Sequence, residues 1–233
     1  MDIKQARKDF FRKSKYELID DYVISNGHKH PFALIVPGGG YFMVCNHVEG
    51  IPVAKKLNEK GISAFILYYR VKNEAIYPNP QDDLARAVKY IIDNADKYNV
   101  EKDNYSIWGA SAGGHLTASF GTDNMGYLKY NLEKPGCLVL SYPVISMLPK
   151  YTHKDTHDNL LGKNTTRELE EFTSVEKHVH NEYPDTFVWC GSIDKTVNPI
   201  NTESLKDELI KNNIRHECHI YGDVDHGVGV GTG

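Results

Sequence analysis

The sequence predicts an α/β protein with a mostly parallel central sheet and helices on both of its faces. Short apolar runs alternate along the chain with amphipathic segments. Most of these runs are nearly continuous in apolar residues, which is typical of strands buried on both faces of a parallel sheet. Because strands and helices alternate, we expect right-handed crossover connections. The predicted strands are Phe32–Val36, Ala64–Tyr69, Tyr105–Trp108, Cys137–Ser141, Thr186–Cys190 and Glu217–Tyr221.

The predicted helices have recognisable ends and apolar stripes. Pro52 is suited to the first turn of a helix, and Gly61 supplies a left-handed residue at its end. Asp83 starts a later helix, where it is interpreted as a structural residue that pairs with Arg70. Two helices carry apolar residues at helical spacing, namely Leu84, Val88, Ile91 and Ala95 after Pro80, and Leu205 and Leu209 after Asn201.

Residues 146–183 interrupt the alternation of strands and helices. The segment is polar and contains one expected helix, capped by Thr165 with Glu168 three residues later. It predicts a small cap over the carboxyl edge of the sheet, the edge at which open α/β sheets bind ligands. No repeat or long linker divides the chain, so residues 1–233 are interpreted as one domain with this insertion.

The composition excludes several classes of function. Charged residues make up 25% of the 233, and the formal net charge is −4 with both signs mixed, which does not fit a nucleic-acid-binding protein. No apolar run approaches the ~20 residues of a membrane span, and residues 1–15 lack the apolar block of a secretory signal. The four cysteines form no CxxC pair, and His153 with His157 has no third metal ligand nearby. We therefore expect a reduced, cytoplasmic protein without membrane attachment, metal or organic cofactor.

Ser111 lies in the motif Gly109-Ala110-Ser111-Ala112-Gly113, which has the pattern GxSxG. The motif follows a predicted strand and opens a run of small residues suited to a helix, as a nucleophile elbow requires. In such an elbow the serine occupies a sharp, strained turn, and the flanking glycines leave room for neighbouring backbone. A glycine-rich turn with an incidental serine would have the same sequence, so the motif alone leaves both interpretations open.

A glycine turn, Pro37-Gly38-Gly39-Gly40-Tyr41, follows the first predicted strand. Glycines at a strand end allow backbone N–H groups to turn toward a developing oxyanion, and the N–H after the nucleophile would complete the oxyanion hole. The alternative is a glycine loop that cradles a phosphate. The turn lacks the Lys-Ser/Thr pair of a P-loop and the spacing of GxGxxG, which disfavours that alternative.

His226 and Asp194 are the candidate base and acid. His226 follows the last predicted strand, and Asp194 lies a few residues beyond the strand before it. Serine, acid and histidine occur in this order along the chains of α/β hydrolases. Asp223 and Asp225 are rivals for the acid, but they are too close to His226 in sequence to reach its Nδ1 easily.

The chain resembles α/β-hydrolase esterases of the bacterial acetyl esterase and xylan esterase type, a group of sugar-ester hydrolases. The resemblance implies the α/β-hydrolase fold, with Ser111, Asp194 and His226 as the catalytic triad. The matching stretches follow the family order from about residue 32 onward and are IVPGGGY (35–41), EGIPVAKKLNEKG (49–61), FILYYRV (65–71), IWGASAGGHL (107–116), LSYPVIS (140–146), NLLG (159–162) and DHGVGVGTG (225–233).

The same resemblance implies the amides of Gly39, Gly40 and Ala112 as oxyanion donors. Two features depart from the family pattern. Position 37 is Pro where the hormone-sensitive-lipase type has His, and the chain ends seven residues after His226 in a glycine-rich stretch. Because each interior Gly costs a helix about 1 kcal/mol relative to Ala, this stretch is not expected to form the terminal helix that buttresses the histidine loop in relatives. We therefore expect that helix to be missing and the loop to be held by other means, such as a second subunit in a homodimer.

By resemblance, the expected function is that of a serine carboxylesterase that removes short acyl groups, such as acetyl, from carbohydrates through an acyl-enzyme. Tyr41 and Phe42 are expected to line the pocket for a small ester substrate, together with residues of the cap. One alternative is a non-catalytic protein that binds a small ligand on a hydrolase scaffold. Another is a peptidase or lactonase with the same triad, because these activities differ in pocket shape rather than in nucleophile.

Overall fold

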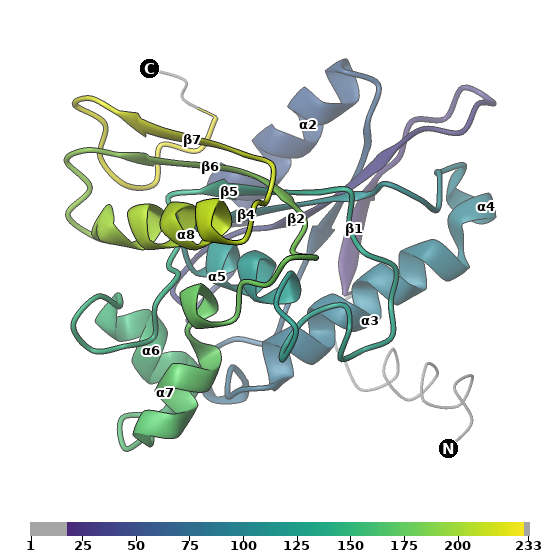
Figure 1. The fold of residues 1–233 in the computed structure, drawn as a ribbon. Coiled ribbons are helices and arrows are strands. Elements are labelled where there is room, and N and C mark those ends of the chain that lie inside the picture. The colour runs from purple at the N-terminus through teal and green to yellow at the C-terminus, as the bar shows by residue number, and fades with distance from the viewer. Residues whose placement is uncertain (1–17, 231–233) are drawn as a thin grey trace, which may run out of the picture.

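The computed structural model describes residues 18–230, which form one seven-stranded sheet with the strand order β1-β3-β2-β4-β5-β6-β7 (Figure 1). β1 pairs antiparallel with β3, and all other neighbours are parallel. The prediction of a mostly parallel sheet is therefore confirmed. The strands are β1 (Ile19–Tyr22), β2 (Phe32–Val36), β3 (Ser63–Leu67), β4 (Ser106–Ala110), β5 (Cys137–Ser141), β6 (Asp185–Gly191) and β7 (His216–Tyr221).

Every strand predicted from the sequence is present, with its ends within two residues of the prediction. The strand that was not predicted is β1, whose sequence Ile-Asp-Asp-Tyr is half polar and too short to show a period. The helices of the described residues are η1 (Asn46–Gly50), α2 (Ile51–Glu59), η2 (Lys72–Glu74), α3 (Asn79–Asp93), α4 (Ala95–Tyr98), α5 (Ser111–Phe120), α6 (Lys154–Leu161), α7 (Arg167–Thr173), η3 (Val175–Lys177) and α8 (Ile200–Lys211).

Helices cover the two faces of the sheet unequally. In Figure 1, α3, α5 and α8 lie on one face, and α2 lies on the opposite face. Alternate residues of the strands supply the two cores: Leu34 and Phe65 face α3 and α5, and Ile35 and Ile66 face α2, all of them at most 1% exposed. Helices on both faces are therefore confirmed. On the α2 side, no helix of residues 18–230 covers β5 and β6, where buried residues alternate with half-buried ones.

Residues 146–183, the segment expected to form a cap, contain two α-helices, α6 and α7, and the short 3-10 helix η3, where one helix was expected. The expected capping residue was one position too early: α7 begins at Arg167, and it is the hydroxyl of Thr166, not of Thr165, that accepts a hydrogen bond from the Leu169 amide at 3.3 Å. The cap residue must lie immediately before the first helical residue, so that its side chain faces the unpaired amides of the first turn.

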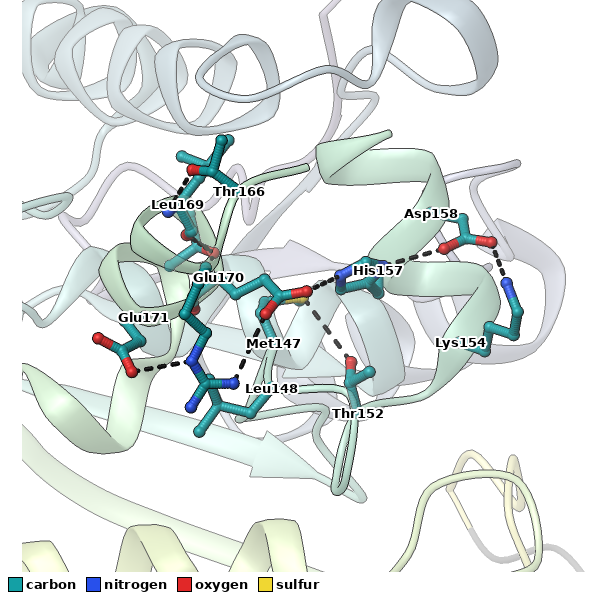
Figure 2. A network of polar contacts seen from close by, with 12 residues as sticks. Met147, Leu148, Thr152, Lys154, His157, Asp158, Thr166, Leu169, Glu170 and Glu171 are labelled. Atoms are coloured by element: carbon teal, nitrogen blue, oxygen red, sulfur yellow. Dashed lines mark hydrogen bonds and ion pairs between the residues drawn. The ribbon is translucent and has the colours of Figure 1, made fainter. Parts of the chain in front are cut away.

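A polar network joins the two cap helices (Figure 2). The His157 ring on α6 contacts Asp158 through Nδ1 at 2.9 Å and reaches Glu170 on α7 through Nε2 at 3.1 Å. Arg167 lies 3.6 Å from the same Glu170 carboxylate. Both ring nitrogens of His157 thus face carboxylate oxygens, and the residue links α6 to α7. Within residues 18–230 no group of three or more His, Cys, Asp or Glu side chains is arranged to hold a metal ion.

The cysteines Cys45, Cys137, Cys190 and Cys218 are all free thiols. Among residues 18–230, no helix has both the length and the apolar character needed to cross a bilayer.

A buried ion pair fixes the start of α3, as expected from the sequence. Asp83 is 2% exposed, and its carboxylate accepts hydrogen bonds from the Arg70 side chain at 2.9 Å and from the Arg70 amide at 2.9 Å. Burial raises the pKa of Asp83, and the hydrogen bonds and charge of Arg70 act in the opposite direction.

We predict that Arg70→Ala lowers the free energy of unfolding by about 2–3 kcal/mol at pH 7, because it leaves a buried carboxylate without its cation. The loss should be smaller at pH 4.5. Without Arg70 the pKa of folded Asp83 rises further, and an acid whose folded pKa is raised loses stability as the pH rises through that value. Urea unfolding at both pH values measures this.

Lys29→Ala is the matched control, because Lys29 pairs with Asp96 on the surface, with side-chain exposures of 54% and 76%. It should leave the unfolding midpoint unchanged at both pH values. An Arg70→Ala loss that is equal at the two pH values would contradict the argument from burial.

Candidate active site

Ser111 occupies a sharp turn between β4 and α5. Its φ of +53° lies in the left-handed region, which non-glycine residues rarely adopt. The glycines on either side are needed for close approach. A Cβ on Gly109 would lie 2.3 Å from the Thr117 hydroxyl, and a Cβ on Gly113 would lie 2.1 Å from the carbonyl oxygen of Val36. The local geometry is that of a nucleophile elbow, and the strained turn projects the serine beyond the strand end.

Ser111, His226 and Asp194 form a continuous hydrogen-bonded chain. Ser111 Oγ lies 2.9 Å from His226 Nε2, and His226 Nδ1 lies 2.7 Å from Asp194 Oδ2. A carboxylate can only accept, so Nδ1 carries the proton and Nε2 is left free to accept from the serine hydroxyl. The structure thus brings together the three side chains that the sequence put forward, although they come from the ends of β4, β6 and β7.

Asp194, rather than Asp223 or Asp225, contacts the histidine ring. The Asp194 side chain is fully buried, and its second oxygen accepts from the amides of Thr196 at 2.9 Å and Val197 at 2.8 Å. Asp225 instead accepts from the backbone amide of His226 at 2.8 Å, and so it shapes the loop. Its hydrogen bonds to the amides of His226 and Lys195 lower the pKa of Asp225.

Among the amides of the glycine turn that have no acceptor within residues 18–230 are those of Gly39 and Gly40. Their φ angles are +121° and +65°. The carbonyl groups of the turn are held from outside: Asn159 of α6 donates to the Gly40 carbonyl at 2.8 Å, and the Phe42 amide donates to the Gly39 carbonyl at 2.9 Å. The Ala112 amide lies in the first turn of α5, where amides lack an intrahelical acceptor.

Tyr41 and Phe42, the two residues expected to line the pocket, lie in different environments. Tyr41 is 0% exposed, and its hydroxyl bonds Nδ1 of His115 at 2.9 Å, so its side chain belongs to the core and does not line a substrate pocket. The reason is the left-handed backbone at Tyr41, with φ +56°, which turns the ring inward. Phe42 is 51% exposed beside the glycine turn, where it can contact a substrate.

The cap contributes a histidine that sequence reasoning had set aside. His153 precedes α6, and its Nδ1 lies 2.8 Å from the Thr156 hydroxyl. Burial lowers the pKa of His153; the charge of His226 acts in the same direction, and Asp155 and Asp194 oppose it. The charges of His226 and Asp194 are thus among those that act on His153. The signal in the sequence that could have drawn attention to His153 is its position immediately before a helix of residues 146–183.

Glu49 and Tyr142 were also missed as residues of the site. The Glu49 carboxylate accepts from the Gly38 amide at 2.7 Å, and Tyr142 packs its ring against His226 with the ring centroids 4.6 Å apart. Both residues lie within stretches of the family resemblance. Tyr142 also follows the end of β5, next to the nucleophile strand, which is a signal that could have found it.

His115 lies beneath the site and is fully buried. Its Nδ1 faces the Tyr41 hydroxyl, and its Nε2 lies 2.9 Å from the carbonyl of Thr173 in the cap. Burial lowers the pKa of His115 from 6.5 to about 4, so the folded protein keeps the ring neutral. The ring therefore joins the glycine turn to the cap without introducing a charge.

We predict that the stability advantage of the wild type over His115→Asn shrinks as the pH falls below 6.5 and reverses before pH 4. The unfolded wild type binds a proton that the folded protein excludes, so its unfolding free energy falls by up to about 1.4 kcal/mol per pH unit. Asn has no such titration and at pH 7 costs about 1 kcal/mol through the lost bond to Thr173. Urea titrations measure the gap. A gap independent of pH would contradict the prediction, and the exposed His28→Asn is the control.

Known relatives of the chain are enzymes named for carbohydrate and ester hydrolysis. An endo-1,4-beta-xylanase B from Butyrivibrio fibrisolvens is 31% identical over 247 residues, covering 98% of this chain and 39% of that protein. An acetylxylan esterase from Xylanibacter ruminicola is 31% identical over 202 residues, covering 84% of this chain and 41% of that protein. The chain thus spans only about two fifths of the length of these curated relatives.

Solved structures share the fold. The acetyl ester-xyloside bifunctional hydrolase of Caldicellulosiruptor lactoaceticus matches with a TM-score of 0.83 and 32% identity, over 92% of this chain and 80% of that one. A carboxylesterase from Lactobacillus plantarum matches with a TM-score of 0.77 at 21% identity, over 93% of this chain and 82% of that one, a likeness of fold alone. The fold is that of the α/β hydrolases. Residues 20–209 match the BD-FAE family, and the chain belongs to that family.

Proposed function

We propose that this chain is a serine carboxylesterase that hydrolyses short-chain acyl esters. The observation that carries the proposal is the hydrogen-bonded chain from Ser111 through His226 to Asp194, with 2.9 and 2.7 Å between its partners. The serine stands on a left-handed turn, and the unengaged amides of Gly39 and Gly40 follow the neighbouring strand. A nucleophile, a base with an orienting acid, and oxyanion donors are the parts that acyl transfer needs.

In the first half of the reaction, His226 Nε2 accepts the proton of the Ser111 hydroxyl while Oγ attacks the carbonyl carbon of the ester. Asp194 holds the ring in the required tautomer and stabilises the imidazolium. The carbonyl oxygen takes up the negative charge and is stabilised by the amides of Gly39, Gly40 and Ala112, at about 3 kcal/mol for each donor. The carbon–oxygen bond to the alcohol then breaks, and His226 delivers its proton to the departing oxygen.

In the second half, water replaces the alcohol. His226 removes a proton from the water as it attacks the acyl-enzyme carbonyl, and the oxyanion forms again on the same amides. The bond to Ser111 Oγ breaks, the carboxylic acid leaves, and the histidine returns its proton to the serine. The cycle consumes one ester and one water, and these residues supply every proton transfer.

The substrate class we propose is acetyl esters on carbohydrates. An acetylxylan esterase and an acetyl ester-xyloside hydrolase are among the chain's relatives, each about a third identical to it. Phe42 and Met43 stand beside the glycine turn with 51% and 49% exposure, and such apolar surface suits contact with a substrate. A peptidase or a lactonase would use the same triad, and a binding protein would leave the ester intact.

We predict that Ser111→Ala lowers kcat for the hydrolysis of p-nitrophenyl acetate by at least about 10³-fold, because no other group can form the acyl-enzyme. Ser119→Ala is the matched control, since Ser119 lies on the same helix, is buried, and its hydroxyl donates to the Leu116 carbonyl at 2.8 Å, within the helix. It should retain activity. Steady-state rates and labelling by a fluorophosphonate probe measure both effects.

Two outcomes of that experiment would contradict the proposal. Turnover that persists in Ser111→Ala would remove the serine from the mechanism. A wild-type protein that neither hydrolyses esters nor reacts with the fluorophosphonate would favour the non-catalytic binding protein.

A second prediction concerns the substrate. Acetylated xylo-oligosaccharides should be deacetylated with a kcat/KM above that for aryl esters of longer acyl chains, and aryl acetate should exceed aryl octanoate. Acetate release and p-nitrophenol release measure the two series, with Ser111→Ala as the blank. A higher kcat/KM for a peptide amide or a lactone than for every acetyl ester would favour the peptidase or lactonase alternative.

A further inference from the structure

Glu49 is a buried acid next to the nucleophile that the reaction itself does not use. It is 7% exposed, and residues 18–230 form no ion pair with it. Its carboxylate receives only neutral donors, the Gly38 amide on one oxygen at 2.7 Å and the Tyr142 hydroxyl on the other at 2.9 Å. Burying a carboxylate without a cation is unfavourable, and so its position calls for an explanation.

Tyr142 carries the connection onward from Glu49. Its hydroxyl also accepts a hydrogen bond from the Gly229 amide at 3.2 Å, three residues beyond the catalytic histidine. The Tyr142 ring contacts the His226 ring at an interplanar angle of 64°. Burial raises the pKa of Tyr142, and the charge of Glu49 acts in the same direction, so the hydroxyl stays protonated and donates.

The backbone of Tyr142 is itself constrained. Its φ is +38°, and its amide donates to the carbonyl of Trp189 at 2.6 Å. Such a conformation persists only where the surroundings fix it, and here it aims the side chain between Glu49 and the histidine loop. The chain of donors therefore runs without conflict from the Gly229 amide through the Tyr142 hydroxyl to Glu49, which also holds the Gly38 amide.

From this arrangement we infer that Glu49 and Tyr142 are positioning residues that brace the histidine loop against the glycine turn. The inference rests on the proposed function. Glu49 removes the Gly38 amide from the set of free donors and leaves the next two amides to face the oxyanion. Tyr142 anchors the loop within a single chain, so a second subunit is not needed to hold His226. The transition state needs both parts in place at once, whereas ground-state binding of a small ester does not.

The test compares three variants on p-nitrophenyl acetate. Tyr142→Phe keeps the ring and removes the hydroxyl, and Glu49→Gln keeps the shape and removes one acceptor. Each should lower kcat about 10- to 100-fold with KM within about 2-fold, as expected when catalytic groups are displaced slightly. The double variant should lose no more than the worse single variant, because the two residues act through one connection.

Tyr183→Phe is the matched control. Tyr183 is 2% exposed, and its hydroxyl donates to the Ala118 carbonyl at 2.7 Å, so the variant loses a comparable buried hydrogen bond away from the triad. It should lower the thermal midpoint about as much as Tyr142→Phe and leave kcat unchanged. A purely structural role for Tyr142 would give the two variants the same kinetics.

Amide hydrogen exchange supplies a readout that does not depend on activity. Exchange at residues 224–230 should accelerate in Tyr142→Phe and in Glu49→Gln but not in Tyr183→Phe. If the wild type is active and both single variants keep its exchange rates and its kcat, the inference is wrong. It is also wrong if the kcat losses of the two single variants multiply in the double variant. If exchange is faster in Tyr142→Phe and Glu49→Gln but the wild type neither hydrolyses esters nor reacts with a fluorophosphonate, the positioning role is supported and the proposed function is contradicted.

Discussion

The left-handed backbone at Ser111 is the constraint on which the rest of the site depends. A φ of +53° is unfavourable for serine, and it is maintained because β4 and α5 are packed so closely that a Cβ on either neighbouring glycine would clash. The turn directs Oγ toward the edge at which β2, β6 and β7 also end. Tyr41 and Tyr142 adopt positive φ angles at that same edge. The strain is therefore concentrated where the loops must converge, and the regular sheet beneath it supports the convergence.

Much of this arrangement could be predicted from the sequence because it is encoded locally. The strands appear as apolar runs, the elbow as GxSxG after a strand, and the order of Ser111, Asp194 and His226 follows from the topology of the sheet. Side-chain direction is not encoded in this way. Tyr41 follows three glycines and was expected at the pocket, but its φ of +56° turns it into the core toward His115, a partner 74 residues away.

The missed residues have a common physical origin. Glu49 and Tyr142 lie 93 positions apart, and neither belongs to a motif with a fixed spacing. A carboxylate before a helix is ordinarily interpreted as a charge that favours the helix dipole, and a tyrosine after a strand as core. Only the tertiary contact reveals that the Glu49 carboxylate accepts from the Tyr142 hydroxyl and from the Gly38 amide. β1 was missed for a related reason: its pairing with β3 depends on a neighbour in space, and its own four residues show no pattern.

Three of the buried carboxylates in this fold are compensated in three different ways. Asp83 has a guanidinium, Asp194 has two amides and an imidazole, and Glu49 has an amide and a phenol. The Asp83–Arg70 ion pair lies at the start of α3 and contacts no residue of the triad, so it contributes to stability alone. Asp194 and Glu49 both act on the surroundings of His226: Asp194 accepts from its Nδ1, and Glu49 accepts from Tyr142, whose ring packs against the imidazole. Under the proposed mechanism these two carboxylates hold the histidine and its loop in position, and so they contribute to the site as well as to the fold.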